Sequence, residues 1–212
     1  MSDVPGRPTG PRSRSICAVG KRPILTPFTG DEEADRLLSE DGMALLVGML
    51  LDQQVPMEWA FRGPFELKRR LGFLDAATVA AMDPDALVAA FVEKPALHRY
   101  PASMAKRVHE LATFLVERYD GKADRVWKGV RDPAVLLERL QELPGYGKQK
   151  AAIFLAILGK RLGAAPAGWE EHAGPYGQPG HRSIADVDGP GAVDKVRAYK
   201  QEMKRKAKAA SA

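Results

Sequence analysis

The 212-residue sequence contains one cysteine, and this scarcity excludes an intramolecular disulfide framework, a multi-cysteine zinc site and an iron–sulfur cluster. Aromatic residues amount to only 7% and runs of β-branched residues are scarce, which disfavours a β-sandwich or a β-barrel. The four histidines show no ligand spacing, so no zinc-type metal site is expected. No apolar stretch approaches a membrane span in length, and the N-terminus lacks the apolar run of a signal peptide. These absences together predict a protein of the reducing cytoplasm that makes no contact with a membrane.

Charge is distributed unevenly along the chain, whose net charge is +5. Residues 1–23 carry five Lys or Arg against one Asp, and residues 195–212 carry seven against one Glu. The intervening body is therefore mildly acidic, with a net charge of −5. Basic ends of this kind indicate contact with a polyanion, although solvated tails that keep the protein soluble explain them equally well.

Hydrophobic residues make up 45% of the chain, and Ala- and Leu-rich helical patterns predict an all-α fold built from many short helices. Residues 1–23, with Pro, Gly and Ser among scattered arginines, are expected to form a disordered basic leader. Helices are predicted from Asp31 to Leu38, over 43–51, from Met57 to Leu71 with an interruption at Gly63 and Pro64, from Asp75, from Asp83, over Pro101–Tyr119, over Asp132–Leu140, over Lys148–Leu162 and from Ala192 onward. Residues 163–182, with five Gly and three Pro, are expected to form a long loop.

The most informative segment is the string Leu-Pro-Gly-Tyr-Gly-Lys-Gln-Lys at 143–150, which lies between two helical patterns. Gly145 and Gly147 permit positive φ and the close approach of another backbone. The helix that follows begins at once, so its first amides lack intrahelical partners and, beside a glycine turn, form a nest for a phosphate oxygen. Residues 143–163 carry four Lys or Arg and no acidic residue, which favours contact with the DNA backbone without sequence readout. The residues expected to make this contact, unless the segment is an ordinary helical hairpin, are Gly145, Tyr146, Gly147, Lys148, Gln149 and Lys150.

Three segments of the sequence resemble the HhH-GPD superfamily of DNA glycosylases, which includes endonuclease III and 3-methyladenine DNA glycosylase II. They are the string Leu-Asp-Gln-Gln-Val-Pro-Met-Glu-Trp-Ala at 51–60, the 143–150 string, and the ending with Ala-Asp-Val at 185–187 and Arg-Ala-Tyr-Lys-Gln at 197–201. The likeness is greatest to actinobacterial base excision repair proteins of the HhH-GPD type, and it covers about residues 24–208. The resemblance implies that 143–150 is the hairpin of a helix-hairpin-helix motif.

The resemblance also implies two helical subdomains with a cleft between them. Residues 24–40 together with 163–208 would form a terminal subdomain, and residues 41–162 a helical-barrel subdomain that carries the helix-hairpin-helix motif at about 134–162. The protein would be a monomer that acts on double-stranded DNA containing a damaged base, in the cytoplasm and associated with the nucleoid. No cofactor would be required, but family positions that hold a monovalent cation, Na⁺ or K⁺, when DNA is bound match the backbone carbonyls of Gln141, Leu143 and Tyr146.

The reaction implied by the resemblance is cleavage of the bond between a damaged base and its deoxyribose, after the base is flipped out of the duplex. A carboxylate near the sugar would stabilise the oxocarbenium-like transition state and could orient water. The family's catalytic aspartate lies downstream of the hairpin, so Asp186 is the first candidate and Asp188 the second. Helix capping is the alternative role for either residue. The spacing from hairpin to aspartate is longer than in endonuclease III, because of the segment at 163–182.

Gln149 occupies the position at which bifunctional family members have a lysine nucleophile. Glutamine cannot form a Schiff base with the sugar, so the resemblance implies a monofunctional glycosylase that leaves an intact abasic site. Lys148 and Lys150 flank this position but point about 100° away on either side of a helix, which favours phosphate contacts for both.

Gln53 or Gln54 is expected to enter the duplex at the vacated base position, because this neighbourhood supplies the inserted residue in the family. A polar helix end is the alternative, and the choice between the two glutamines stays open. Asp52 beside them is unusual, since a carboxylate next to DNA is unfavourable unless it faces the base pocket or a cationic partner. It is therefore a further candidate for the base pocket, where it could read the edge of a base. Candidates for stacking on a flipped base, with ordinary packing as the alternative for each, are Trp59, Trp169, Tyr176 and Phe61.

Two other functions compete with the glycosylase. One is a non-catalytic DNA-binding or lesion-sensing protein, which would keep the hairpin but lack a working carboxylate. The other is a structural helical protein with a basic tail, which explains the composition but not the concentration of cations and glycines at 143–163. The substrate also stays open: the Gln-Gln string leans toward alkylated purines, and deaminated or oxidised bases remain alternatives.

Overall fold

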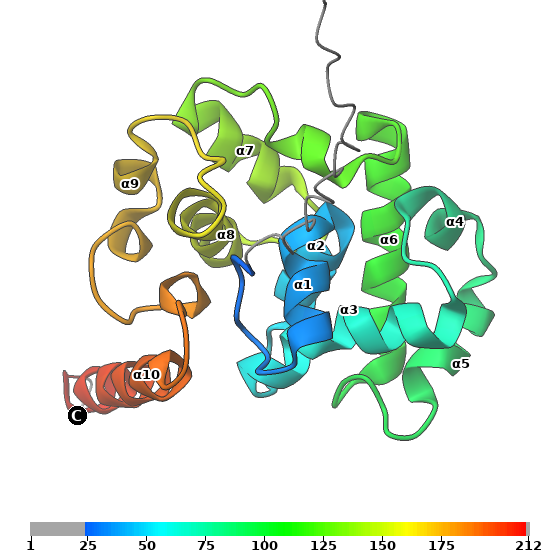
Figure 1. The fold of residues 1–212 in the computed structure, drawn as a ribbon, viewed down its shortest axis with the longest axis horizontal. Helices are drawn as coiled ribbons and strands as arrows, with labels where there is room; N and C mark the ends of the chain where they lie inside the picture. Colours follow the sequence, from blue (N-terminus) through cyan, green and yellow to red (C-terminus); the bar gives the residue numbers. More distant parts are fainter. Residues whose placement is uncertain (1–23, 211–212) are drawn as a thin grey trace, which may run out of the picture.

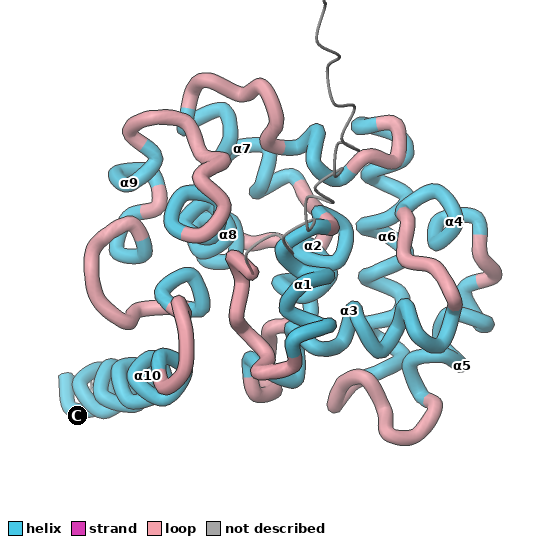
Figure 2. Tube along the Cα trace, in the orientation of Figure 1, coloured by secondary structure: helices cyan, strands magenta, loops and turns pink. Residues whose placement is uncertain are grey.

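The computed structural model describes residues 24–210, in which every regular element is a helix and no strand is present (Figure 1, Figure 2). The elements in chain order are α1 (Glu32–Glu40), α2 (Gly42–Leu51), α3 (Met57–Leu71), α4 (Ala76–Ala81), α5 (Pro84–Val92), α6 (Pro101–Tyr119), η1 (Ala123–Val126), α7 (Pro133–Glu142), α8 (Lys148–Lys160), α9 (Trp169–His172), η2 (Gly174–Tyr176), η3 (Ile184–Asp186) and α10 (Ala192–Ala210). The predicted all-α class is therefore confirmed, whereas the leader predicted at 1–23 lies outside the described residues. No helix within 24–210 has both the length and the apolar character needed to cross a bilayer.

Five of the helices within 24–210 begin at an aspartate whose side chain accepts hydrogen bonds from amides of the first turn. These N-caps are Asp31 of α1, Asp41 of α2, Asp75 of α4, Asp83 of α5 and Asp132 of α7. Such a cap satisfies amides that have no intrahelical partner, and it is worth about 1 kcal/mol. The predicted starts at Asp31, Asp75, Asp83 and Asp132 are confirmed.

Helix α2 lies among the other helices and is buried on every side, as its continuous apolar sequence predicts (Figure 1). The apolar side chains between Met43 and Leu51 are each at most 4% exposed. Helix α3 packs along α2, helices α6 and α8 also contact it, and α1 packs on both α2 and α3. The approach of α3 depends on Gly48, because a Cβ at this position would lie 2.7 Å from Cδ1 of Phe61.

Helix α3 runs without interruption through Gly63 and Pro64, so the predicted break is wrong. A proline in a helix interior removes one backbone hydrogen bond and costs about 3 kcal/mol. Both residues are buried, and α3 packs against α1, α2 and α5, so burial of its apolar face offsets that cost. The predicted helix end is confirmed, because Gly72 adopts the left-handed conformation at the C-cap.

The segment after α8 is more structured than its composition predicts. Helix α8 ends at Lys160 rather than at Leu162, and residues 163–182 contain α9 and η2 instead of one continuous loop. The physical reason is packing, since Trp169 of α9 lies on Gly159 of α8, where a Cβ would come within 2.2 Å of the indole. Helix α9 also contacts α7, and η3 contacts α8, so this part of the chain is held against the α7–α8 pair.

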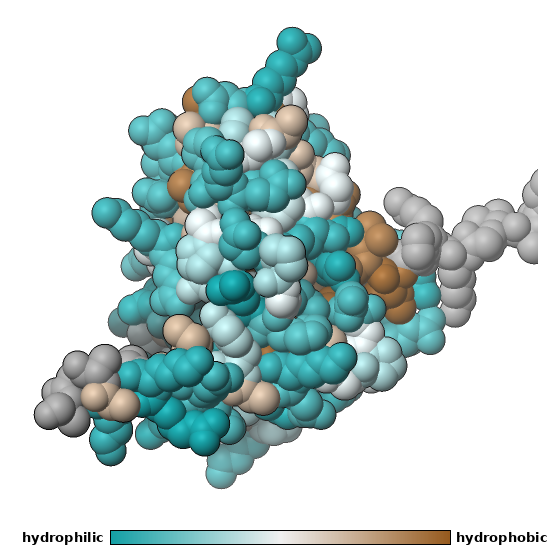
Figure 3. Space-filling view, turned by 90° about the vertical axis from the view of Figure 1, so that its left-hand side faces the viewer, coloured by the Kyte–Doolittle hydropathy of each residue, from teal (hydrophilic) through white to brown (hydrophobic). Residues whose placement is uncertain are grey.

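Helix α10 extends from this segment at the lower left of Figure 1, where it contacts η3. Its start at Ala192 agrees with the prediction. Ala192 and Val196 are buried, whereas the side chains farther along the helix are mostly exposed. The face of the molecule that carries α9 and α10 is largely hydrophilic (Figure 3).

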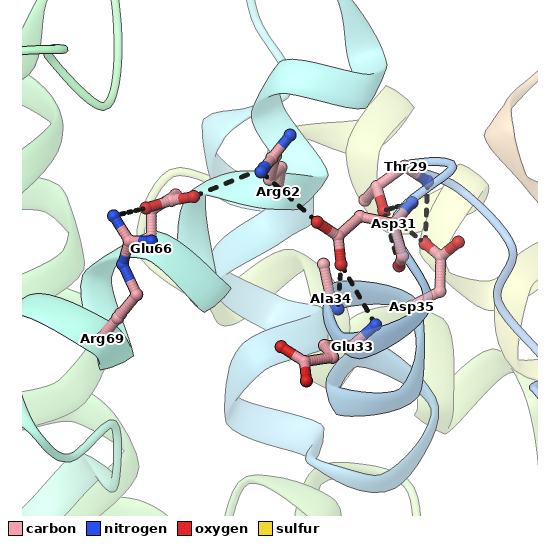
Figure 4. Close-up of polar contacts among 8 residues, drawn as sticks. All are labelled: Thr29, Asp31, Glu33, Ala34, Asp35, Arg62, Glu66 and Arg69. Carbon is pink, nitrogen blue, oxygen red and sulfur yellow. Dashed lines mark hydrogen bonds and ion pairs between the residues drawn. The ribbon is translucent and has the colours of Figure 1, made fainter.

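The start of α1 is tied to α3 by a chain of polar contacts (Figure 4). Asp31 caps α1 with one carboxylate oxygen and pairs through the other with Arg62 at 3.3 Å. Arg62 also pairs with Glu66, one turn along α3, at 3.4 Å. The buried Asp35 accepts hydrogen bonds from the amide and the hydroxyl of Thr29, both at 2.8 Å. Burial raises the pKa of the Asp35 carboxyl, although these hydrogen bonds oppose the effect.

The substitution Gly48→Ala tests the packing of α3 on α2. Alanine normally stabilises a helix interior by about 1 kcal/mol relative to glycine, but here the added methyl group meets the ring of the fully buried Phe61. We expect Gly48→Ala to lower the free energy of unfolding by about 1–3 kcal/mol, measured by urea denaturation. The matched control is Gly189→Ala, where a Cβ meets nothing within 4 Å and the change should stay below about 0.5 kcal/mol. An unchanged or raised stability of Gly48→Ala would contradict the close contact.

Candidate functional site

The turn between α7 and α8 is tight, and two independent features require a glycine at position 145. Gly145 has a φ of +79°, and a Cβ there would lie 2.4 Å from Cδ1 of Leu50. The Tyr146 amide donates to the Leu143 carbonyl at 2.9 Å, which closes the turn. Gly147 is extended, with a φ of −80°, and a Cβ there would meet nothing within 4 Å. Of the two glycines, only Gly145 therefore uses the positive φ and the close approach that the sequence suggested.

Two side chains of this segment reach inward to α2. The Tyr146 hydroxyl donates to the Leu46 carbonyl at 2.7 Å, and its ring packs edge-on against Phe154. Lys150 Nζ donates to the Leu50 carbonyl, near the C-terminal end of α2, where a cation is favourable. Burial raises the pKa of the Tyr146 hydroxyl and lowers the pKa of Lys150 to about 8. These side chains hold the turn to α2, whereas the sequence suggested a phosphate contact for Lys150.

The outward side of the turn is formed by Gly145, Gly147, Lys148 and Gln149, which are all exposed. No side chain caps the first turn of α8, and none of the residues in that turn is acidic. The amides at this helix end therefore leave the positive end of the helix dipole open to solvent. Gln149 Nε2 donates to the hydroxyl of Tyr176 at 2.9 Å, so two of the predicted site residues meet here.

The two glutamines that follow α2 have different environments. Gln53 turns inward, where its Nε2 donates to the Leu50 carbonyl at 3.1 Å and its Oε1 accepts from Arg107 at 3.2 Å. Gln54 is exposed, has a φ of +56° and accepts a hydrogen bond from the Tyr100 hydroxyl at 3.3 Å. Of the two residues between which the sequence could not choose, Gln54 is the one whose side chain faces solvent.

A buried histidine that the sequence did not single out fixes this loop. His98 is 1% exposed; its Nδ1 accepts from the Tyr100 amide at 3.0 Å, and its Nε2 lies 3.0 Å from the Gln53 carbonyl. Because Nδ1 accepts, the proton of the neutral ring is on Nε2, which donates to that carbonyl. Burial lowers the pKa of His98, which favours the neutral ring. No spacing pattern could have indicated this role, since His98 and Gln53 are 45 residues apart and meet only in the folded chain.

Asp52 lies at the C-cap of α2, within electrostatic range of groups on three other helices. Its charged neighbours are Lys200 of α10, Lys150 of α8 and Glu58 of α3. Burial raises the pKa of the Asp52 carboxyl, the two lysines oppose this effect, and Glu58 adds to it. Among residues 24–210, none donates a hydrogen bond to the Asp52 carboxylate or forms an ion pair with it.

Asp186, the first candidate for a catalytic carboxylate, has protein partners for both of its carboxylate oxygens. Its Oδ1 pairs with Lys160 at 2.6 Å, and its Oδ2 accepts from the amides of Arg182 at 2.8 Å and Ser183 at 3.0 Å. The Asp186 side chain is 6% exposed and that of Lys160 is 16% exposed. Asp186 and Ser183 form a capping box on η3, so the alternative role of helix capping is confirmed. Asp188, the second candidate, is exposed.

The lysine contacts place the two aspartates near opposite ends of α8. Asp52 neighbours Lys150, close to the start of this helix, whereas Asp186 pairs with Lys160, its last residue. The two lysines are ten residues apart, which corresponds to about 15 Å of helix. The exposed turn therefore lies at the same end of α8 as Asp52.

The four aromatic residues considered for base stacking have different surroundings. Trp59 on α3 is 41% exposed, and Tyr176 is half-buried. Trp169 is half-buried and lies on α8. Phe61 is fully buried with its ring centroid 5.1 Å from that of Phe28, so the idea that it stacks on a base is wrong.

The three residues predicted to hold a cation through their carbonyls, Gln141, Leu143 and Tyr146, line neither of the two cavities described below. Gln141 is exposed on α7, and the Leu143 carbonyl already accepts the Tyr146 amide of the turn. Within the described chain, no group of three or more His, Cys, Asp or Glu side chains is placed to hold a metal ion. A cavity of about 600 Å³ beside α1, α2 and η1 is lined by none of the predicted site residues. A second cavity, of about 430 Å³, lies between residues 27–30, Glu58 and the start of α10.

Comparison of the chain with models of protein families, with curated proteins and with solved structures found no match. The chemistry of this region therefore has to be inferred from its own residues. Three features meet at the C-terminal end of α2: the exposed turn before α8, the exposed Gln54 and the Asp52 carboxylate. Asp186, which the sequence favoured, is held at the other end of α8.

Asp186→Asn is expected to destabilise the fold, because it leaves the largely buried Lys160 ammonium without its carboxylate. Removing one partner of a buried ion pair costs about 3 kcal/mol, which urea denaturation measures. Combining this substitution with Lys160→Met should restore part of the loss. The control is Glu142→Gln at the exposed pair with Arg118, where the cost should stay below about 1 kcal/mol. Wild-type stability of Asp186→Asn would mean that the pair has no structural role.

Lys150→Met tests whether the folded protein destabilises the charged form of this lysine. The folded protein releases the proton of Lys150 near pH 8, whereas the unfolded chain holds it to about pH 10.5. The unfolded state therefore binds more protons between these values, so the contribution of this site to stability rises with pH across the window. Between pH 7 and pH 10, urea denaturation should show the stability of the wild type gaining about 2 kcal/mol relative to Lys150→Met. Lys148→Met, which removes the same charge from an exposed position, is the control, and a stability difference independent of pH would contradict the burial of Lys150.

Proposed function

We propose that the chain is a monofunctional DNA glycosylase of base excision repair, which flips a damaged base out of duplex DNA and hydrolyses its bond to deoxyribose. The observation that carries the proposal is the outward side of the turn before α8, where uncapped amides, two glycines and Lys148 face solvent together. Such a surface is suited to a phosphate, and a phosphate contact would not depend on the base sequence. In this proposal α7, the turn and α8 form the helix-hairpin-helix motif.

The turn before α8 and the loop that carries Gln53 and Gln54 are bonded to the same backbone carbonyl. This arrangement supports contact of both segments with one DNA duplex. Lys150 from α8 and Gln53 from the loop both donate to the Leu50 carbonyl. Gln54 follows directly, in a left-handed conformation that directs it away from the helix end. We assign Gln54 the role of filling the space left by the flipped base, because its side chain is exposed, whereas that of Gln53 is half-buried and bonded to Arg107.

Base release without strand cleavage is proposed from the identity of the residue at the exposed end of α8. Gln149 has an amide where a nucleophilic amine would be needed, so it cannot form a Schiff base with the sugar. The next residue, Lys150, has its ammonium engaged by the Leu50 carbonyl. A glycosylase with these residues leaves an intact abasic site.

The proposed cleft for the flipped nucleoside lies between the C-terminal segment and the α2–α3 part of the protein. The cavity of about 430 Å³ between residues 27–30 and the start of α10 supports this placement. Glu58 and Arg197, which form an ion pair, line that cavity together. Division into a terminal and a barrel-like subdomain on the two sides of the cleft is part of the same proposal.

A non-catalytic DNA-binding or lesion-sensing protein is the second candidate function. The observation that favours it is Asp186, whose two carboxylate oxygens are taken by Lys160 and by backbone amides. A carboxylate already paired with a lysine stabilises a cationic sugar poorly, because its charge is compensated. This alternative keeps the contact with DNA and lacks base release, so two measurements separate the functions.

The test of the glycosylase function is incubation of the protein with duplexes that carry alkylated, deaminated or oxidised bases, followed by alkali to reveal abasic sites. We expect salt-sensitive binding, release of a base from at least one duplex, and no covalent adduct on reduction with borohydride. Binding without release would favour the lesion-sensing alternative, and absence of binding would contradict both functions. A strong borohydride-trapped adduct would contradict the monofunctional assignment.

The same test includes a variant of the turn. Lys148→Gln should lower the slope of log affinity against log salt concentration by about 0.9, the loss expected for one phosphate contact. The matched control is Lys128→Gln, which removes an exposed lysine that pairs with Asp124 beside η1 and should leave the slope unchanged. Equal slopes for the wild type and Lys148→Gln would mean that the turn does not touch DNA.

A further inference from the structure

Two exposed polar side chains, Gln54 and Tyr100, meet beside the C-terminal end of α2, although they are 46 residues apart in the chain. The Tyr100 hydroxyl donates to Oε1 of Gln54 at 3.3 Å. The buried ring of His98 is bonded to both segments. Its Nε2 donates to the Gln53 carbonyl and its Nδ1 accepts from the Tyr100 amide, each at 3.0 Å. One buried side chain therefore links the two backbones that carry the exposed pair.

The bond from His98 to the Gln53 carbonyl bears directly on the conformation of Gln54. This carbonyl belongs to the planar peptide group that joins Gln53 to Gln54, so a bond that holds the carbonyl fixes the plane from which φ of Gln54 is measured. That φ is +56°, in the left-handed region that residues other than glycine seldom adopt unless their surroundings hold them there. His98 therefore holds the peptide group whose orientation decides where the Gln54 side chain points.

The rest of this loop is fixed by other bonds, so the role of His98 is confined to the segment that carries Gln54. The Gln53 side chain donates to the Leu50 carbonyl and accepts from Arg107. Lys150, in the first turn of α8, donates to the same Leu50 carbonyl. Without His98, the side chain of Gln53 would keep these partners, whereas the peptide group before Gln54 would lose its own.

The two bonds of His98 require a neutral ring. Nδ1 can accept from the Tyr100 amide only when it carries no proton, so the single ring proton is on Nε2. Burial lowers the pKa of His98, and the positive charges of Lys150 and Arg107 lower it further, although the bond to the Gln53 carbonyl opposes them. The environment of the ring therefore favours the protonation state that the two bonds need.

We propose that His98 is a positioning residue for DNA contact, whose ring holds the peptide group before Gln54 so that this glutamine already points outward when DNA binds. Tyr100, anchored to the same ring, orients the Gln54 carboxamide. The inference rests on the proposed glycosylase function, in which Gln54 fills the space left by the flipped base. A side chain held in its binding conformation loses less freedom on binding. When only a fraction of the molecules has that conformation, the apparent affinity falls by the same fraction.

The tautomer of His98 tests this contact without DNA. In protein labelled with ¹⁵N at histidine, two-dimensional NMR distinguishes protonated from unprotonated ring nitrogens, and His98→Gln identifies the signals of this ring by their loss. Near neutral pH we expect His98 to carry its proton on Nε2 and none on Nδ1. A proton on Nδ1, alone or together with one on Nε2, would overturn the assignment, because Nδ1 could then not accept from the Tyr100 amide.

The effect on DNA contact is measured with two duplexes, one undamaged and one with a tetrahydrofuran abasic-site analogue, which leaves a base position vacant. The wild type is expected to prefer the vacant duplex by about fivefold, which corresponds to one added hydrogen bond. Gln54→Ala should abolish this preference. His98→Asn retains an acceptor near Nδ1 but no donor to the Gln53 carbonyl, so it should also lose the preference. His98→Gln retains a donor near Nε2 and should keep most of the preference.

A double variant shows whether His98 acts through Gln54. In the Gln54→Ala background, His98→Asn should cause no further loss of affinity for the vacant duplex, because the side chain that it positions is already absent. An equal loss in both backgrounds would overturn the inference. The matched control is His109→Asn on α6, a half-buried histidine whose Nε2 has no hydrogen-bond partner within 24–210. This control should keep the preference, and its loss there would show that the effect is not specific to His98.

Base release separates the failure of this inference from the failure of the proposed function. A wild type that releases a base, while His98→Asn keeps the preference for the vacant duplex, would leave the glycosylase standing and overturn the role of His98. A wild type that loses the preference on His98→Asn but releases no base would support His98 and contradict the glycosylase. Equal binding of the two duplexes by the wild type would overturn the inference, and absence of binding would contradict both.

Discussion

Helix α2 has no side that faces solvent, and two of its carbonyls take hydrogen bonds from side chains elsewhere in the chain. The Leu46 carbonyl accepts from the Tyr146 hydroxyl, and the Leu50 carbonyl accepts from Lys150 and Gln53. These bonds attach the turn before α8 to the middle and the C-terminal end of α2, and the loop after α2 to that same end. Because α2 is close-packed against α3, α6 and α8, that end cannot shift without opening the core. The exposed groups of the candidate site therefore have fixed relative positions.

The two ends of α8 serve different purposes in the fold. At the C-terminal end of α8, Lys160 forms an ion pair with Asp186 and so holds the C-terminal segment to the core. Near its start, Lys150 binds the Leu50 carbonyl of α2 and leaves the neighbouring Asp52 without a bonded partner among the described residues. Lys160 thus forms a direct ion pair with Asp186, whereas Lys150 acts on Asp52 only through its charge.

Elements with a strong local signal were predictable from the sequence, and elements decided by packing were not. The helix starts at Asp31, Asp75, Asp83 and Asp132 follow from caps that act over two or three residues. The break predicted at Pro64 was wrong, because burial of α3 offsets the local cost of proline. The segment 163–182 was predicted as a loop, but it contains α9, whose Trp169 packs on α8 where Gly159 leaves room. Local rules failed where tertiary contacts outweighed them.

The sequence by itself determined the all-α class, most helix starts and the tight glycine turn before α8. These features depend on contacts among residues a few positions apart, which a sequence pattern records directly. Only the tertiary structure decided that Gln54 is exposed while Gln53 is half-buried against Arg107, and that Lys150 turns toward α2. It also decided which aspartate is paired, because Asp186 and Lys160 are 26 residues apart and Lys150 and Leu50 are 100 apart. Whether a side chain is free for chemistry depends on neighbours that are distant in sequence, and chain packing alone brings those neighbours together.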